Sequence, residues 1–436
     1  MHLKMALVAE NNVYVQPQAY FGVCHSHLPA LKLESGTCAA QIDTWSKLEN
    51  GTSVSKINAE GNTVEMTNGK TFSYKALVLA PGFNHSMDYI KGLETMEKTP
   101  DSEGMFVHML DSKERTFRNF WNGWHNPNGD MICYSPKAPY KGEGSDFYAL
   151  YYEHFMRQDK MHYRAANNAR VQFWTPNKEI YQFGYANEVA LDECHKRGID
   201  VMFGWEMLEV KVNEHGQKIA VFKNVDNGDL IEKDFFSANI NPPSKPHQFL
   251  IDSGITDAQG GIDVNKHTLQ HNKHENIFAF GDAVGFNTTR TQTAAMAQNP
   301  IVKNNLLRFL QGKEVNGIYD GYTFMPFLLG HSYASNFQHL HDFEPAPLNH
   351  AIPHYGIFSN LYFTRMMTAE LKAGTNYSSF KKDHGPPYGY WPAEYDELEH
   401  CEYLQSHNLT PEDVRHPAAQ ARIDSGVTSD APAITH

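Results

Sequence analysis

Basic charge is scarce in this 436-residue chain, which has 37 Lys and Arg residues against 50 Asp and Glu residues. The net charge of −13 leaves no overall basic footprint for nucleic acid, so we expect no nucleic-acid partner. Long hydrophobic runs are also missing: no stretch of about 18 apolar residues occurs, which predicts no transmembrane helix. We also expect neither a signal peptide nor an arginine-rich transit peptide before Ala6.

Cysteine is rare and dispersed. The five cysteines are Cys24, Cys38, Cys133, Cys194 and Cys401. They form no CxxC pair, and their odd number argues against a disulfide framework and for a reducing compartment. Histidine is abundant, but the pairs at 24–27 and 339–341 lack a second ligand pair at a standard zinc spacing. We therefore expect no metal site.

The chain does contain enough residues for two domain-sized cores, and 41% of them are hydrophobic. Alternating apolar and polar residues at 54–65 and 70–82, with glycines at the turns, predict a small unit of antiparallel strands. An alternating strand and helix pattern follows. Its predicted elements are a strand at 129–134, a helix at 147–159, a strand at 170–175, a helix at 185–197, a strand at 200–205 and a hairpin at 208–225.

The most informative stretch is NIFAFGDAVGFNTTRTQTAAMAQ at 276–298. Its apolar start predicts a buried parallel strand, and the Ala-rich end predicts a helix. At the turn between them, Gly281 would let the backbone approach a ligand, and Asp282 could accept from a ribityl or ribose hydroxyl. The N–H groups that open the next helix would favour a phosphate. The alternative is a plain strand-turn-helix crossover in which Asp282 caps the helix.

The motifs around this turn resemble those of the mitochondrial-type sulfide:quinone oxidoreductases. The matching segments are ALVAEN at 6–11, YVQPQAY at 14–20, LVLAPG at 77–82, NPP at 241–243, DVNKHTLQH at 263–271, GDA at 281–283, RTQTAAMAQ at 290–298 and YDGYT at 319–323. The resemblance implies an α/β fold with two Rossmann-like, disulfide-reductase-like dinucleotide-binding domains. It also implies FAD, quinone and a peripheral place on the matrix side of the mitochondrial inner membrane.

This resemblance divides the chain into four parts. Residues 1–104 and 240–330 would form a discontinuous FAD-binding-type domain, and residues 105–239 a second Rossmann-like domain. Residues 331–382 would form C-terminal strands and an amphipathic helix at 355–372, whose aromatic and Met stripe would face the membrane or a partner. Core packing explains the same stripe equally well. Residues 383–436 have too few apolar residues for a core, so we expect them to bind a partner or remain disordered.

The resemblance also assigns the cofactor contacts. They are Glu10 at the adenosine ribose, Gln16 and Pro17 in the segment before the flavin, Ala80 and Gly82 beside the ring, and Gly281, Asp282 and Arg290 at the second motif. Arg290 stands where the family has a lysine, which keeps the charge and changes the geometry. Pro81 removes a backbone donor from a turn that would lie against the flavin.

Two departures weaken the case for an active enzyme. A glycine-rich turn should precede Glu10 by about 20 residues, and we expect it and the first strand to be missing, so FAD would lack its main phosphate cradle. The strands at 6–8 and 277–280 would then pair directly or take a strand from elsewhere. The short match at 142–144 predicts no NAD(P) site.

The second departure concerns the reactive cysteines. The resemblance places one near Gly142 and the other at Met325, and neither position is cysteine. A thioether forms neither a thiolate nor a disulfide, so we expect no sulfide oxidation through a cysteine pair and no catalytic residues.

Two hypotheses remain. In the first, the chain is a non-catalytic member kept as a structural or accessory subunit of a mitochondrial inner-membrane, respiratory-chain assembly, with other subunits and the membrane surface as partners. In the second, it is an FAD-dependent oxidoreductase that reduces quinone from a donor other than sulfide, with its N-terminal segment supplied elsewhere.

Overall fold

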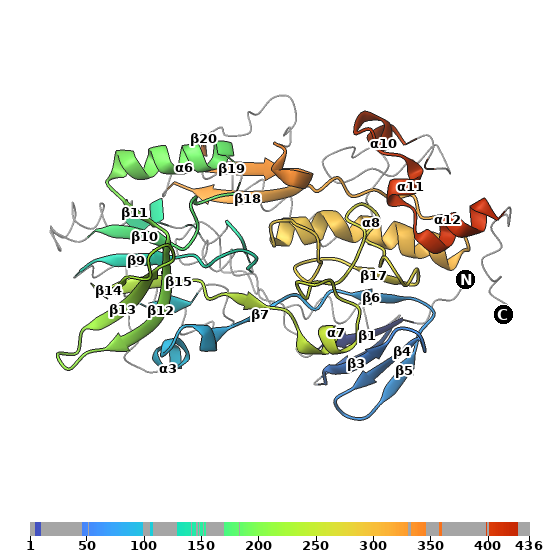
Figure 1. The fold of residues 1–436 in the computed structure, drawn as a ribbon, viewed down its shortest axis with the longest axis horizontal. Coiled ribbons are helices and arrows are strands. Elements are labelled where there is room, and N and C mark those ends of the chain that lie inside the picture. Colours follow the sequence, from blue (N-terminus) through green and yellow to red (C-terminus); the bar gives the residue numbers. More distant parts are fainter. Residues whose placement is uncertain are drawn as a thin grey trace.

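The computed structural model describes residues 5–9, 46–50, 52–98, 105–107, 129–140, 142–144, 147, 149–150, 152–153, 170–182, 184–329, 333–345, 357–359, 398 and 401–425. Two lobes lie side by side along the long axis of the molecule (Figure 1). A short antiparallel pair, β7 (Asn84–His85) with β16 (Ser244–Lys245), runs between them. In the described part of the chain, no helix has the length and apolarity needed to cross a bilayer.

The first lobe is built around β17 (Ile277–Ala279), which pairs in parallel with β6 (Leu77–Leu79). Side chains alternate along a strand, so β17 contributes to two cores. Phe278 packs with Ala297 and Ile301 of α8 (Gln292–Leu310), while Ile277 and Ala279 pack toward the antiparallel sheet. That sheet contains β3 (Val54–Asn58), β4 (Thr63–Met66) and β5 (Thr71–Ser73), as the alternation at 54–65 predicts.

The second lobe holds a five-stranded parallel sheet in the order β11-β10-β9-β15-β8. The strands are β8 (Met105–Val107), β9 (Met131–Tyr134), β10 (Val171–Thr175), β11 (Asp200–Phe203) and β15 (Ser237–Ile240). One face packs on α6 (Gly184–Arg197) and the other on an antiparallel sheet of β12 (Trp205–Val212), β13 (Lys218–Asn224) and β14 (Leu230–Phe235). The strands predicted at 129–134, 170–175 and 200–205 and the helix at 185–197 are confirmed.

Shorter elements complete both lobes. A 3-10 turn, η1 (Met87–Tyr89), and α3 (Leu93–Lys98) follow β7, and α7 (Gln248–Asp252) follows β16. Residues Ile90, Leu93 and Met96 pack on Met207 and Val210 of β12, which ties the segment after β7 to the second lobe. The chain therefore crosses between the lobes twice at the β7–β16 pair.

The strand β1 (Met5–Ala9) pairs in parallel with β2 (Ser46–Asn50), and Leu7 lies opposite Leu48. Phe278 lies opposite Val78 on one side of β17. On the other side, the His271 N–H donates to the Ile277 carbonyl and the Ala279 N–H donates to the Leu269 carbonyl. Both alternatives predicted for the strands at 6–8 and 277–280 are therefore wrong at Phe278. The strands do not pair directly, and residues 269–271 of the same chain, not a strand from elsewhere, bond to that edge of β17.

After α8 the chain forms a three-stranded antiparallel sheet. It contains β18 (Thr323–Leu328), β19 (Tyr333–His339) and β20 (Ile357–Ser359), and a 3-10 turn, η2 (His341–Phe343), follows β19. The strand β20 occupies the first part of the predicted helix at 355–372. That helix prediction is wrong for residues 357–359, which pair with β19, and residues 360–372 lie outside the described residues.

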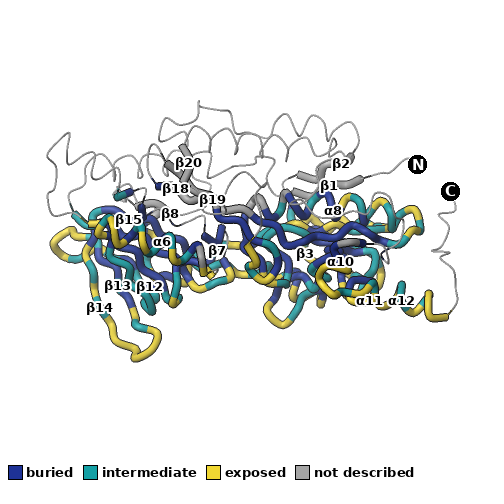
Figure 2. Tube along the Cα trace, turned by 90° about the horizontal axis from the view of Figure 1, so that it is seen from above, coloured by how far each residue is buried: buried dark blue, intermediate teal, exposed yellow. Residues whose placement is uncertain are grey.

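The C-terminal segment 401–425 forms α10 (Glu402–Ser406), α11 (Pro411–Val414) and α12 (Pro417–Asp424). These helices lie against the first lobe on the side of α8 (Figure 1). Leu398, Cys401, Tyr403, Leu404 and Val414 are buried in one cluster with Ile318. For residues 401–425 the expectation of disorder is therefore wrong, because a few apolar side chains suffice to dock the segment on its own chain. The alternative that this segment binds a partner stays a prediction. We call residues 401–425 the C-terminal strap, and Figure 2 shows that it contains both buried and exposed residues.

Candidate functional site

The predicted strand-turn-helix at 276–298 is present. Gly281 ends the strand with φ +81°, a left-handed conformation that favours glycine. Its N–H donates to the Gln298 Oε1 atom at 2.7 Å, and Gln298 is fully buried on α8. The N–H that could approach a ligand is therefore already bonded within the protein. Asp282 is half-buried, and its carbonyl accepts a hydrogen bond from Arg290 Nε at 3.0 Å.

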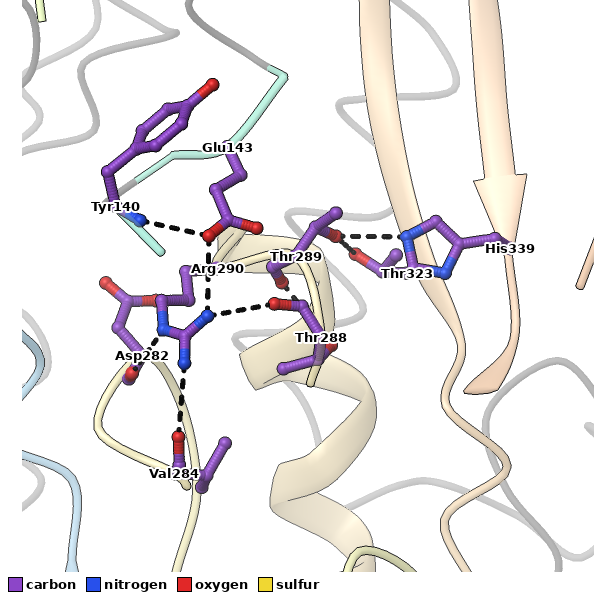
Figure 3. A network of polar contacts seen from close by, with 9 residues as sticks. All are labelled: Tyr140, Glu143, Asp282, Val284, Thr288, Thr289, Arg290, Thr323 and His339. Atoms are coloured by element: carbon purple, nitrogen blue, oxygen red, sulfur yellow. Dashed lines mark hydrogen bonds and ion pairs between the residues drawn. The ribbon is translucent and has the colours of Figure 1, made fainter. Parts of the chain in front are cut away.

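Arg290 is the centre of the site (Figure 3). Its side chain is only 6% exposed, and the guanidinium donates to three carbonyls of its own loop. These are the carbonyls of Asp282 at 3.0 Å, Thr288 at 3.2 Å and Val284 at 3.4 Å. The planar guanidinium of an arginine holds several N–H donors in a fixed geometry and can donate to all three carbonyls at once. The ammonium group of a lysine is less suited to such an arrangement.

The loop 142–144 of the second lobe completes the coordination of Arg290. Glu143, also 6% exposed at its side chain, places Oε1 3.4 Å from Arg290 Nη1 and accepts from the Tyr140 N–H at 2.9 Å. The Gly142 N–H donates to the Arg290 carbonyl at 2.8 Å. A buried ion pair and a backbone hydrogen bond therefore join the two lobes at this point.

The turn at 80–83 approaches the same guanidinium. The Phe83 ring lies against it, with the Arg290 Cζ atom 4.9 Å from the ring centroid, a cation–π arrangement. The predicted loss of a donor at Pro81 leaves its carbonyl, which lies 3.1 Å from Nε2 of His247. Ala80 is exposed, and Gly82 has φ +71°, where an added Cβ atom would meet no atom of the described residues within 4 Å. Among the described residues, the turn contacts the Arg290 guanidinium through Phe83.

The N-terminus of α8 is closed by threonines. Thr291 caps the helix by accepting from the Ala294 N–H at 3.1 Å, and its Oγ1 lies 2.6 Å from that of Thr323. Thr289 joins the cluster through Thr323 and through His339 Nε2, each at 3.2 Å. Burial lowers the pKa of His339 to about 4, so its imidazole is neutral at pH 7. These threonines are buried, and the expectation that the N-terminus of α8 binds a phosphate stays a prediction.

The described cysteines lie in hydrophobic cores. Cys133 on β9 and Cys194 on α6 are each 1% exposed, and Cys401, the first residue of the C-terminal strap, is buried in the cluster that docks the strap. Burial raises the pKa of Cys194 to about 12, so it remains a thiol at physiological pH. Met325 lies in β18, opposite Phe337.

The structure brings together four of the eight residues assigned to the flavin. Arg290 contacts Asp282, and Gly281 and Gly82 lie on the turns that adjoin it. Glu10, Gln16 and Pro17 lie outside the described residues. The sequence did not single out Glu143, Phe83 or Gln298. Its one signal was the pair of glycines around Glu143, which allow positive φ values at Gly142 and Gly144.

These contacts do not fit a bound flavin. The groups that line the site from 282 to 288 are carbonyl acceptors, and the polar edges of an isoalloxazine ring are chiefly acceptors as well. The Gly281 N–H, which could serve such a ring, is bonded to Gln298. The described residues also contain no group of three or more His, Cys, Asp or Glu that could hold a metal.

No family model matches the chain. Over 297 residues it is 27% identical to the mitochondrial sulfide:quinone oxidoreductase of Schizosaccharomyces pombe, covering 67% of this chain and 62% of that protein. The corresponding protein of Dictyostelium discoideum is 28% identical over 292 residues, covering 66% and 61%. The chain thus spans about three fifths of the length of these curated relatives.

Solved structures show the same fold. A chain of the Tetrahymena thermophila mitochondrial ATP synthase aligns with a TM-score of 0.73 and 24% identity, covering 86% of this chain and 90% of that one. The sulfide:quinone oxidoreductase of Aquifex aeolicus aligns with a TM-score of 0.62 and 15% identity, covering 86% of each chain. The resemblance and the two-domain, disulfide-reductase-like α/β fold predicted from the sequence are confirmed.

Proposed function

We propose that this sulfide:quinone oxidoreductase-like chain is a non-catalytic protein, kept as a structural or accessory subunit of a mitochondrial inner-membrane assembly. One observation carries the proposal: the loop at Gly142, where the resemblance places a reactive cysteine, presents Glu143 and closes on Arg290. A carboxylate held in an ion pair cannot attack sulfur or release it. The loop at Glu143 therefore joins the two lobes through the ion pair with Arg290 and carries no redox chemistry.

The remaining thiols support the same proposal. Sulfur transfer beside a flavin requires two accessible thiols, one to attack and one to resolve the sulfur bridge. Cys133 and Cys194 are buried, and the high pKa of Cys194 opposes thiolate formation. The thioether of Met325 cannot replace a thiol at the second position.

The choice of assembly rests on the similar proteins. The curated relatives are named as mitochondrial, and one structural neighbour is a chain of a mitochondrial ATP synthase. We propose ATP synthase as the assembly, in preference to the respiratory-chain complexes that the family resemblance alone would suggest. The chain would sit peripherally on the matrix side, with residues 355–372 outside β20 contacting the membrane surface or a neighbouring subunit.

Cell fractionation tests this proposal directly. The epitope-tagged chain would be expressed in its source cells, and mitochondria would be solubilised in mild detergent and separated on a native gel. We expect the tag to migrate with ATP synthase and to purify without stoichiometric flavin absorbance. A tag found only at the mass of the free chain would refute the assembly role.

The alternative is an FAD-dependent oxidoreductase that reduces quinone from a donor other than sulfide. The observation in its favour is the exposed and half-buried turn surface at Ala80, Gly82 and Gly281, where no atom of the described residues lies within 4 Å of a Cβ added at Gly82. A yellow purified protein that reduces a soluble quinone analogue would establish this alternative. A sulfide-dependent rate with a persulfide on Cys133 or Cys194 would refute the argument from the thiols.

A further inference from the structure

We infer that the side chain of Arg290 is a built-in substitute for the cofactor: the site it fills selects a guanidinium group and excludes a flavin ring. This inference rests on the proposed function and adds what occupies the site. Two segments that the sequence assigned to the flavin converge on this one group, together with the loop where the resemblance places a reactive cysteine. They are the turn before Phe83, the turn at Asp282 and the loop at Glu143.

The chemistry of the lining supports a cation that donates hydrogen bonds. Three carbonyls and one carboxylate oxygen surround the guanidinium, and all of them accept. The planar group also lies against the Phe83 ring. A flavin brought to this position would set its own carbonyl oxygens and ring nitrogens against the same acceptors, with the single N3–H of the ring as donor, so most of these acceptors would lose their hydrogen bonds at a large desolvation cost.

The charges lead to the same conclusion. The guanidinium and the Glu143 carboxylate are both almost fully buried, so each compensates the other in a medium where an uncompensated charge is strongly unfavourable. Any neutral ring that displaced Arg290 would remove the positive charge from beside this carboxylate. The folded chain therefore stays closed around Arg290, and the two lobes remain joined without a cofactor.

Chemical rescue tests this inference. Thermal unfolding of the full chain would be followed for wild type and Arg290→Ala, each with and without millimolar methylguanidinium or riboflavin. We expect Arg290→Ala to lower Tm by at least about 5 °C, and methylguanidinium to restore much of that loss. Riboflavin should raise the Tm of neither protein, because the lining offers acceptors to an acceptor-rich ring.

Three further variants keep the test decisive. Arg290→Lys retains the charge and loses the fork, so it should recover only part of the stability. Arg422→Ala removes a half-exposed arginine that is also paired with a glutamate, and methylguanidinium should leave its Tm unchanged. If Arg290→Ala does not fold, Glu143→Gln in the wild-type background provides the measurement: it should lower Tm, because it removes the counter-charge of the guanidinium.

The outcomes separate this inference from the proposed function. Stabilisation of wild type or Arg290→Ala by riboflavin, or no rescue by methylguanidinium, would overturn the inference even if the protein were colourless and assembled in ATP synthase. Quinone reduction by a flavin-containing wild-type protein would overturn the proposed function, whatever the rescue experiment gave.

Discussion

Arg422 of the C-terminal strap forms a two-point ion pair with Glu275, with Nη1 3.2 Å from one carboxylate oxygen and Nη2 2.9 Å from the other. Glu275 belongs to the segment that leads into β17, so the strap is attached beside the central strand. A second pair, Arg415 with Glu314, attaches it near the end of α8. The strap is thus part of the first lobe, although its sequence lacks the apolar density of a core segment.

The first prediction concerns that attachment. Leu404 is 1% exposed in the cluster under the strap, so Leu404→Ala should weaken docking by about 2 to 4 kcal/mol through lost burial and the cavity left behind. Limited proteolysis should then cut within residues 401–425 while a protected fragment of the two lobes persists. Arg422→Ala is the control, and its half-exposed pair should change the cleavage rate only slightly. Equal cleavage rates for Leu404→Ala and wild type would contradict this account.

The second prediction concerns acid stability. Burial lowers the pKa of His267, His271 and His339 to about 4, from an ordinary 6.5. The unfolded chain therefore binds protons at these groups before the folded chain does, and stability falls as pH decreases from about 6.5 toward 4. Each group should account for about 2 to 3 kcal/mol over that range. Urea unfolding at several pH values should show that the free energy of unfolding falls less steeply with decreasing pH in His339→Gln than in wild type. The same pH dependence in both proteins would argue against buried histidines as the origin.

The third prediction concerns thiol chemistry. Native protein at pH 8 should protect Cys133, Cys194 and Cys401 from iodoacetamide, because all three are buried and Cys194 has a pKa of about 12. Peptide mass spectrometry should find these residues modified only after denaturation. Rapid labelling of Cys194 in the folded protein would show that the core around α6 opens.

The fourth prediction concerns the turn at Gly281. Gln298→Ala removes the oxygen that accepts the Gly281 N–H, and should lower the free energy of unfolding by about 1 to 3 kcal/mol. Hydrogen exchange at the Gly281 amide should accelerate with it. Gln248→Ala, which removes an exposed side-chain bond to Asp252, is the matched control and should change neither quantity appreciably.

Much of the architecture could be predicted from sequence. The apolar residues before Gly281 and the Ala-rich segment after it indicated the strand, turn and helix that the structure contains. Local periodicity carries such information because each element has its own spacing of apolar residues. The family motifs predicted the two-domain α/β fold class, and the comparisons confirmed that fold class.

The contents of the site could not be predicted in the same way. Glu143 and Arg290 are separated by 147 residues, and nothing local to either indicates the other. The strap was misjudged because overall polarity hid Tyr403, Leu404 and Val414, which are few but buried together. Isolated apolar positions become informative only once the surface that receives them is known.

The pairing of Val78 with Phe278 has a consequence for how the chain acquires its structure. These two residues belong to neighbouring strands, yet the whole second lobe lies between them in the sequence. The second lobe must therefore be synthesised before β6 and β17 of the first lobe can pair. Closing a loop of this length costs conformational entropy. Early folding of the inserted lobe would bring the two halves near each other at β7 and β16. Until then Phe278 and its neighbours have nowhere to be buried, and nascent or truncated chains that end before α8 should depend on chaperones to avoid aggregation.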